Sequence, residues 1–375
     1  MQEKKSNQLI AVFFSLLRAG LWETEVRLSD YESIDFAAIQ SLAEEQSVVG
    51  LIAAGLEHVV DKKPAKQDVL QFIGQALQIE QQNTAMNYFI GVLVDKMQKE
   101  GIYTLLLKGQ GIAQCYERPL WRSCGDVDFF LSDDNYQKAK DYLIPLASSV
   151  EGEYLREKHL GMTIDPWVVE LHGRLYSGLS SSVEKGLDEI QKDVFYRGNV
   201  RSWMNGDTQV FLLSADNDAV YVFTHILQHF YKGGIGVRQI CDWCRLLWTY
   251  REEIDHELLE HRLKAMGLMT EWKAFGAFAV DYLGMPLDDM PLYSPDNKWK
   301  RKAGRICSFI LEVGNFGHNR DKSYFGKYPY VIRKAISFGR RVGDLYRHAR
   351  ISPLDSVRFL PRIVINGVRS AMRGE

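Results

Sequence analysis

The chain has 375 residues and a formal net charge of −2, with 46% hydrophobic and 25% charged residues. These values are ordinary for a soluble globular protein of two or three domains with a large core. The nearly balanced charge excludes the overall basic character of many nucleic-acid-binding proteins, although nucleic acid as a partner is not excluded.

The five cysteines are an odd number, and residues 1–8 (MQEKKSNQ) lack the pattern of a secretory signal. The apolar run at residues 9–17 is about half as long as a bilayer-spanning helix. We therefore predict reduced cysteines and a cytoplasmic protein, with peripheral contact at a membrane as a further option.

Residues 1–100 are predicted to form an N-terminal helical region. Apolar side chains at helical spacing define a first helix around residues 9–17 and a second within residues 47–60. A third is predicted over residues 67–99, and Gly101 follows it in the usual position of a glycine stop.

Residues 101–205 are predicted to form an α/β core. Its expected elements are a short buried strand near 104–109, a helix at 109–117, a strand at 126–131, a helix capped by Ser132, and two strands around 152–165 and 166–175. The first strand, helix and second strand make one compact unit, and this unit carries the most informative residues of the chain.

Asp126 and Asp128 stand out in this unit. Side chains alternate between the two faces of a strand, so both carboxylates point one way while Val127 and Phe129 point toward the core. Adjacent carboxylates repel each other unless a cation lies between them, and hard oxygen ligands favour Mg²⁺ or Mn²⁺. The alternative is a pair of exposed aspartates that caps the end of a strand.

The order of an apolar strand, Lys-Gly, a short helix, an arginine and Gly-Asp-x-Asp resembles an uncharacterised nucleotidyltransferase-like family of bacterial proteins, within the DNA polymerase β-like nucleotidyltransferase superfamily. The matching residues are Lys108, Gly109, Gly111, Arg122, Gly125, Asp126 and Asp128. The motif core covers residues 104–171, with weaker likeness at 236–247. The resemblance implies an α+β fold, in which a small mixed-sheet nucleotidyltransferase core is flanked by N-terminal and C-terminal helical regions.

The resemblance also implies a reaction. A nucleoside monophosphate would pass from a nucleoside triphosphate, such as ATP, to an unknown acceptor, with Mg²⁺ or Mn²⁺ as cofactor and release of pyrophosphate. The alternative is a non-catalytic nucleotide-binding or scaffold protein with a decayed site, which the unusual Lys-Gly-Gln-Gly turn at residues 108–111 favours.

Glu170 is predicted to be the third carboxylate of the metal site. It lies in the middle of a predicted strand between two apolar residues, where a buried carboxylate needs a partner. An edge strand with one wet face is the alternative, and Asp165 is a weaker candidate because a proline follows it. Asp126, Asp128 and Glu170 are thus the predicted catalytic residues and metal ligands. His172 shares the face of Glu170 and is placed on the acceptor side.

Lys108, Gly109, Gly111 and Arg122 are predicted to contact the nucleotide. A glycine turn at a helix N-terminus presents free N–H groups to an anion, and Lys108 adds a positive charge. A simple tight turn with a solvent-exposed lysine is the alternative. Arg122 lies four residues before Asp126, so it could bind a phosphate or neutralise Asp126 when no metal is present.

Residues 206–330 are predicted to form a C-terminal helical domain. Arg238 and Asp242 are four residues apart on one predicted helix, and form either a structural ion pair or part of the acceptor side of the site. His225 and His229 also have a spacing that suits zinc, but their apolar neighbours favour an interior or interface position.

Residues 331–375 are predicted to be a basic amphipathic segment. They contain ten Lys or Arg and three Asp or Glu, a local charge of +7, while the remainder of the chain carries −9. Arginines interleaved with apolar residues are typical of helices that bind an anionic surface, either lipid or nucleic acid. The alternative is a helix that packs on the acidic remainder of the protein.

Overall fold

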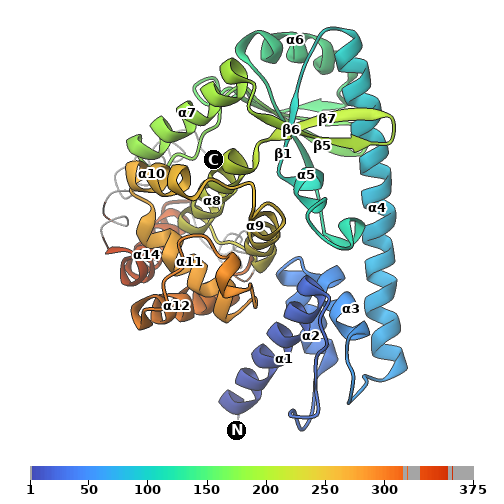
Figure 1. Ribbon diagram of the computed structural model, residues 1–375, viewed down its shortest axis with the longest axis vertical. Helices are drawn as coiled ribbons and strands as arrows, with labels where there is room; N and C mark the ends of the chain where they lie inside the picture. The colour runs from blue at the N-terminus through green and yellow to red at the C-terminus, as the bar shows by residue number, and fades with distance from the viewer. Residues whose placement is uncertain (1, 316–318, 320–329, 354–356, 358–375) are drawn as a thin grey trace.

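The computed structural model describes residues 2–315, 319, 330–353 and 357. A seven-stranded mixed sheet is flanked by helices from both ends of the chain, which confirms the predicted α+β class (Figure 1). The long helix α4 (Lys66–Lys99) runs along one side of the molecule, from the N-terminal helices to the sheet (Figure 1).

The sheet has the strand order β3-β4-β5-β2-β1-β7-β6. Its strands are β1 (Leu105–Leu107), β2 (Asp126–Phe130), β3 (Ser149–Val150), β4 (His159–Ile164), β5 (Trp167–His172), β6 (Val200–Asn205) and β7 (Thr208–Leu213). The pairs β2/β5 and β1/β7 are parallel, and the other pairs are antiparallel. Strand β2 therefore lies between the strand that precedes the Lys-Gly turn and the strand that carries Glu170.

The sheet continues past residue 205, where helices were expected. Strand β7 forms a hairpin with β6 and pairs in parallel with β1, with Leu105 opposite Phe211. The two residues between the paired strands are Gly206 and Asp207, and Gly206 has a φ of +60°. A two-residue Gly-Asp loop is a hairpin signal, and the sequence interpretation overlooked it.

Helices α1 (Gln2–Trp22), α2 (Phe36–Glu45), α3 (Val49–Glu57) and α4 confirm the helical prediction for the N-terminal region. Helices α1 and α3 cross at two glycines. A Cβ atom on Gly20 would lie 1.8 Å from the carbonyl oxygen of Leu51, and one on Gly55 would lie 2.0 Å from that of Leu16. The two backbones can approach this closely only because both positions lack a side chain.

The remaining helices surround the sheet and form the C-terminal half. They are α5 (Gly109–Ala113), α6 (Asp133–Leu143), α7 (Ser181–Arg197), α8 (Ala215–Lys232), α9 (Val237–Thr249), α10 (His256–Met266), α11 (Met269–Asp281), α12 (Asn297–Val313) and α14 (Tyr330–Ile351), with 3₁₀ turns η1 (Pro119–Trp121), η2 (Ile144–Leu146) and η3 (Leu287–Asp289). Ser132 caps α6 as predicted, because its hydroxyl accepts a hydrogen bond from the backbone N–H of Asn135. Helix α5 is shorter than the predicted 109–117.

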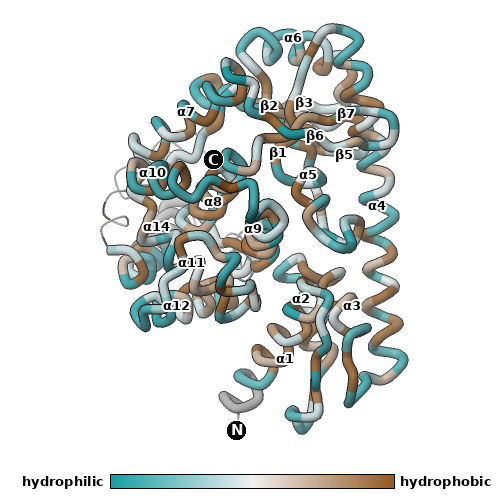
Figure 2. The backbone as a smooth tube through the Cα atoms, in the orientation of Figure 1, coloured by the Kyte–Doolittle hydropathy of each residue, from teal (hydrophilic) through white to brown (hydrophobic). Residues whose placement is uncertain are grey.

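Two apolar cores lie on the two faces of the sheet. Val127 and Phe129 belong to the core that α4 and α6 cover, as the alternation along β2 predicted. The other core extends from the opposite sheet face into both the N-terminal and the C-terminal helices, which contact each other, for example, at the rings of Phe14 and Phe278. Figure 2 shows α3 as mainly hydrophobic and α6 as mainly hydrophilic, in keeping with their different burial.

Helix α14 covers part of the predicted basic segment. Its buried His348 packs against Phe230 and Phe309, and Arg347 lies 2.7 Å from Glu312 of α12. These contacts match the packing interpretation for this helix. Residues 354–356 and 358–375 lie outside the described residues. In the part of the chain that the structure describes, no helix combines the length and apolar character that crossing a membrane requires.

Candidate active site

Two neighbouring strands bring the predicted acidic residues together. In the parallel pair β2/β5, Asp126 is opposite Val168 and Asp128 is opposite Glu170. Neighbouring strands lie about 4.8 Å apart, and side chains of paired residues point to the same face. Asp126, Asp128 and Glu170 thus share one sheet face, which is the arrangement expected from the alternation within each strand.

Lys108 lies at the turn between β1 and α5 and reaches back to Asp128. Its Nζ is 3.2 Å from Oδ1 of Asp128, and its backbone has a φ of +49°. Burial alone would lower the pKa of Lys108, but the charge of Asp128 outweighs it and raises that pKa above its ordinary value. Lys108 is therefore a positively charged, half-buried residue in contact with Asp128, and not a solvent-exposed lysine.

Asp128 is the buried centre of this group. Its Oδ1 also lies 2.9 Å from Nε2 of His172, which comes from the end of β5. Burial opposes ionisation of Asp128, yet Lys108 and His172 hold its pKa below the ordinary value. Conversely, burial would lower the pKa of His172, while hydrogen bonds to Asp128 and Glu170 raise it. These contacts therefore favour the charged forms of Asp128, Lys108 and His172.

Asp126 is exposed, and its carboxylate makes no hydrogen bond or ion pair with any residue that the structure describes. Repulsion from Asp128 is the main reason that the pKa of Asp126 is raised above its ordinary value. A like-charged neighbour and an unpaired carboxylate are what a divalent cation would relieve. The geometry of Asp126, Asp128 and Glu170 consequently fits Mg²⁺ or Mn²⁺.

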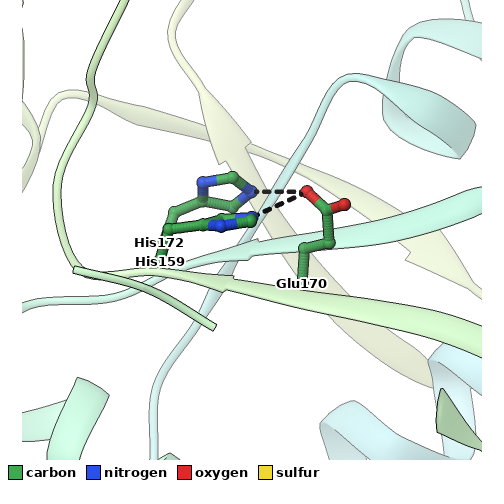
Figure 3. Close-up of side chains that lie close together, drawn as sticks. All are labelled: His159, Glu170 and His172. Carbon is green, nitrogen blue, oxygen red and sulfur yellow. Dashed lines mark hydrogen bonds and ion pairs between the residues drawn. The ribbon is translucent and has the colours of Figure 1, made fainter. Parts of the chain in front are cut away.

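Glu170 is held by two histidines. Its Oε2 lies 3.0 Å from Nε2 of His159 and 3.5 Å from Nε2 of His172 (Figure 3). Hydrogen bonds from both imidazoles lower the pKa of Glu170 well below its ordinary value. Sequence reasoning missed His159. It does lie in a predicted strand, but its position opposite His172 depends on the register of β4 against β5.

A cavity of about 300 Å³ opens beside these residues. It is lined by Lys108, Tyr154, Glu157, His159, Glu170, His172, Arg174, Tyr176, Tyr221, His225, Gln228 and His229. The last four come from α8, so this helix forms the wall opposite the strands. The pair His225 and His229, expected to be structural, thus faces the candidate site.

The surroundings of His225 and His229 favour their neutral forms. Burial, with a further contribution from the charge of Lys108, lowers the pKa of His229 to about 4 and that of His225 well below its ordinary value. Their Nε2 atoms lie 3.1 Å apart. The pocket therefore combines charged groups on the strands with uncharged imidazoles on the helix.

Two residues predicted to contact the nucleotide make contacts within the protein. Arg122 is buried, and its guanidinium donates from Nε and Nη2 to the two carboxylate oxygens of Asp242, at 3.0 and 2.7 Å. It therefore neutralises Asp242, not Asp126. Gly111 is needed for packing, because a Cβ atom there would lie 2.6 Å from Cδ2 of Leu212.

Gly109 keeps the turn geometry that the prediction required. Its φ is +43°, a backbone conformation that glycine adopts without strain, and a Cβ atom there would lie 3.3 Å from Sγ of Cys124. Gly109 and the rest of α5 are buried, however. The turn at Gly109 thus sets the position of Lys108 in the site. Gly109 itself is not exposed on the surface.

Arg238 and Asp242 form an ion pair on α9, with Nη1 of Arg238 3.3 Å from Oδ2 of Asp242. Asp242 also accepts a hydrogen bond of 2.8 Å from the hydroxyl of Tyr116. The structural interpretation of this pair is confirmed, and Asp242 is not among the residues that line the cavity. Asp165, the weaker candidate for the third carboxylate, lies in the turn between β4 and β5.

The chain matches a known protein family. A family model described as "Uncharacterised nucleotidyltransferase" matches residues 32–284, which include every strand of the sheet and helices α2 to α11. No curated protein and no solved structure matches the chain.

Proposed function

Because this chain belongs to the uncharacterised nucleotidyltransferase family, we propose that it transfers a nucleoside monophosphate from a nucleoside triphosphate to an acceptor that binds in the cavity beside Glu170. Family membership supports a transferase. The metal dependence, the donor and the acceptor side are parts of the proposal and rest on the geometry of the site.

One observation carries the proposal: Asp126, Asp128 and Glu170 share one face of adjacent strands, with Lys108 in contact with Asp128. Three carboxylates and one lysine match the needs of nucleotidyl transfer, which must bind metal ions and stabilise charge on phosphate oxygens. The unpaired carboxylate of Asp126 and the repulsion that raises its pKa favour a bound cation over a purely structural role.

Each residue has a distinct part in this proposal. Asp126, Asp128 and Glu170 would hold Mg²⁺ or Mn²⁺, whose charge would stabilise the transition state at the α-phosphate and activate the acceptor oxygen. Lys108 remains protonated because of Asp128 and would offer its ammonium to a phosphate oxygen. Gly109 would set the turn that aims Lys108 at the site.

His172 belongs to the acceptor side of the proposal. It lies between Asp128 and Glu170 and lines the cavity, on the side from which an acceptor hydroxyl or phosphate would approach the carboxylates. The cavity of about 300 Å³ suits a small group or the end of a longer molecule. Tyr154, Tyr176 and Tyr221 on its walls favour an acceptor with flat or apolar parts.

The test is to incubate the full chain with each of the four nucleoside triphosphates and Mg²⁺, and to measure both binding by calorimetry and release of pyrophosphate. Candidate acceptors would be added as fractions of small molecules, RNA, lipid-linked sugars and proteins. Mg²⁺-dependent binding that is lost in Asp126→Asn, with pyrophosphate release in at least one fraction, is the expected result. Equal binding by wild type and Asp126→Asn would overturn the proposal.

A nucleotide-binding protein without transferase activity is the second candidate. It is favoured by the existing partners of Asp128, since its Oδ1 already contacts both Lys108 and His172. These contacts would have to rearrange for Asp128 to bind a metal ion. Binding of nucleotide with no pyrophosphate release in any fraction, and with no labelled product from α-labelled nucleotide, would favour this candidate.

A further inference from the structure

The cavity contains a second group of potential metal ligands with different chemistry. Nε2 of His159, Oε2 of Glu170 and Nε2 of His172 all lie within 4.8 Å of one another. The two nitrogen-to-oxygen distances are 3.0 and 3.5 Å, and Figure 3 shows both imidazoles directed at the same carboxylate oxygen. Ligand atoms around a tetrahedral ion with bonds of about 2.0–2.1 Å lie roughly 3.3 Å apart. Small shifts of the three side chains would therefore bring their ligand atoms to the spacing that such an ion requires.

We infer that His159, Glu170 and His172 bind a d-block divalent cation, Zn²⁺ being the best match, next to the cation proposed for Asp126 and Asp128. Imidazole nitrogens suit Zn²⁺ and other transition metals, whereas Mg²⁺ and Ca²⁺ select oxygen ligands. Two histidines and one carboxylate with an open fourth position are a donor set known from zinc sites that leave room for water or substrate.

The sheet holds the three ligands in place. His159 on β4 and His172 on β5 are register partners, and Glu170 lies two residues before His172 on the same face. The centroids of the two imidazole rings are 4.8 Å apart. Ligands that project from paired strands need little ordering when the ion binds, which is the geometry that a metal site requires.

Without a metal ion, protons on the two imidazole nitrogens occupy the positions that the ion would take. The contacts of Glu170 Oε2 with the two imidazoles require an N–H on each nitrogen, and an incoming ion would displace these protons. Release of His172 would leave Asp128 with Lys108 as its partner, 3.2 Å away. Asp128 therefore keeps a counter-charge when the ion binds.

Glu170 can serve both cations. The two histidines contact Oε2, while Oε1 makes no hydrogen bond or ion pair with a residue in the described ranges. A bridging carboxylate is the usual link in sites where two metal ions lie roughly 3.5–4 Å apart. The zinc inference itself does not depend on nucleotidyl transfer, because it concerns only the affinity of His159, Glu170 and His172 for an ion.

The test uses the full chain after dialysis against a chelator, titrated with Zn²⁺ alone and with Mg²⁺ alone in a calorimeter. Binding of one Zn²⁺ per chain is expected, with an affinity that falls by more than about 100-fold in His159→Gln, since loss of even an outer-shell partner costs about 10–100-fold. The matched control is His261→Gln, which changes an exposed histidine of α10 and should bind Zn²⁺ as wild type does. Thermal melting of each variant verifies the fold.

Two further variants separate the possible outcomes. In Co²⁺-loaded protein, the visible absorption of a tetrahedral site should be present in wild type and absent in His159→Gln. Asp126→Asn should lose Mg²⁺-dependent nucleotide binding and keep the Zn²⁺ site, so failure of one proposal is distinguishable from failure of the other. Loss of Zn²⁺ in His225→Gln with full retention in His159→Gln would overturn the inference, as would the absence of Zn²⁺ binding in wild type.

Discussion

Asp128 and Glu170 are register partners on the parallel strands β2 and β5. This pairing places two carboxylates next to each other on one sheet face, although they are 42 positions apart in the chain. Three basic side chains contact these two carboxylates. Asp128 contacts Lys108 and His172, and Glu170 contacts His159 and His172. Asp126, two residues before Asp128 on β2, has no such partner among the residues that the structure describes.

Asp128 has charged partners and Asp126 has none among the described residues. Replacing each aspartate by asparagine should therefore have opposite effects on the stability of the metal-free protein. Asp126→Asn removes a repulsive charge and should stabilise the fold by roughly 0.5 kcal/mol, the size of a like-charge pair on neighbouring residues. Asp128→Asn leaves Lys108 without its counter-charge and should destabilise by about 3–5 kcal/mol. Urea denaturation with a chelator present measures both, and destabilisation of equal size in the two variants would contradict the assignment.

Stability should depend on pH through His225 and His229. Their pKa values are lowered in the folded protein, so the unfolded chain takes up protons first as the pH falls below about 6.5. The free energy of unfolding should therefore decrease between pH 6.5 and 5, by at most about 1.4 kcal/mol per pH unit for each histidine. The double variant His225→Gln/His229→Gln should flatten this slope, measured by denaturation at each pH with a chelator present.

The matched control for this pH experiment is His256→Gln, which replaces an exposed histidine at the start of α10. Its slope between pH 6.5 and 5 should equal that of wild type. If the double variant keeps the wild-type slope, the two histidines are protonated in the folded protein. The prediction that they line the cavity in their neutral forms would then be wrong.

Arg122 should act on stability and not through direct contact with nucleotide. Arg122→Ala leaves the carboxylate of Asp242 buried with weaker partners and should cost about 3–5 kcal/mol. Arg174→Ala is the comparison, because its ion pair with Asp188 is partly exposed and should be worth about 1 kcal/mol or less. Chemical denaturation measures both. An Arg122→Ala variant with wild-type stability and weakened nucleotide binding would restore the original prediction for this residue.

Two glycine substitutions should differ in sign. Gly111→Ala brings a Cβ atom to 2.6 Å from the buried side chain of Leu212 and should destabilise by about 1–3 kcal/mol. Gly74→Ala lies on an exposed face of α4 with nothing within 4 Å, and should stabilise by about 0.5–1 kcal/mol through helix propensity. Thermal denaturation of both variants under identical conditions tests the packing role of Gly111, and stabilisation by both substitutions would exclude it.

The basic C-terminal segment should bind anionic vesicles more strongly at low salt than at high salt, since each basic group near such a surface contributes on the order of 1 kcal/mol and ions screen it. Flotation of the full chain with vesicles of anionic lipid measures this, and vesicles of neutral lipid are the control. If the protein stays in the soluble fraction at both salt concentrations, the segment is better interpreted as a packing element, in line with the contact of Arg347 with Glu312.

The sequence by itself determined the parts of the site that depend on local periodicity. Alternation with a period of two places Asp126 with Asp128 and Glu170 with His172 on single strand faces, and any fold that keeps these strands keeps both pairs. The glycine at position 109, the cap at Ser132 and the helices of the N-terminal region are local in the same sense, because they depend on backbone conformation within a few residues.

The tertiary structure alone decided which of these local groups meet. The register of β4 against β5 brings His159 to Glu170, and the packing of α8 over the sheet brings His225 and His229 to the same cavity. Arg122 pairs with Asp242, 120 residues away, and not with nearby Asp126. Such contacts cannot be deduced from spacing, because a charged side chain that becomes buried pairs with whichever opposite charge the packing of distant segments places within its reach.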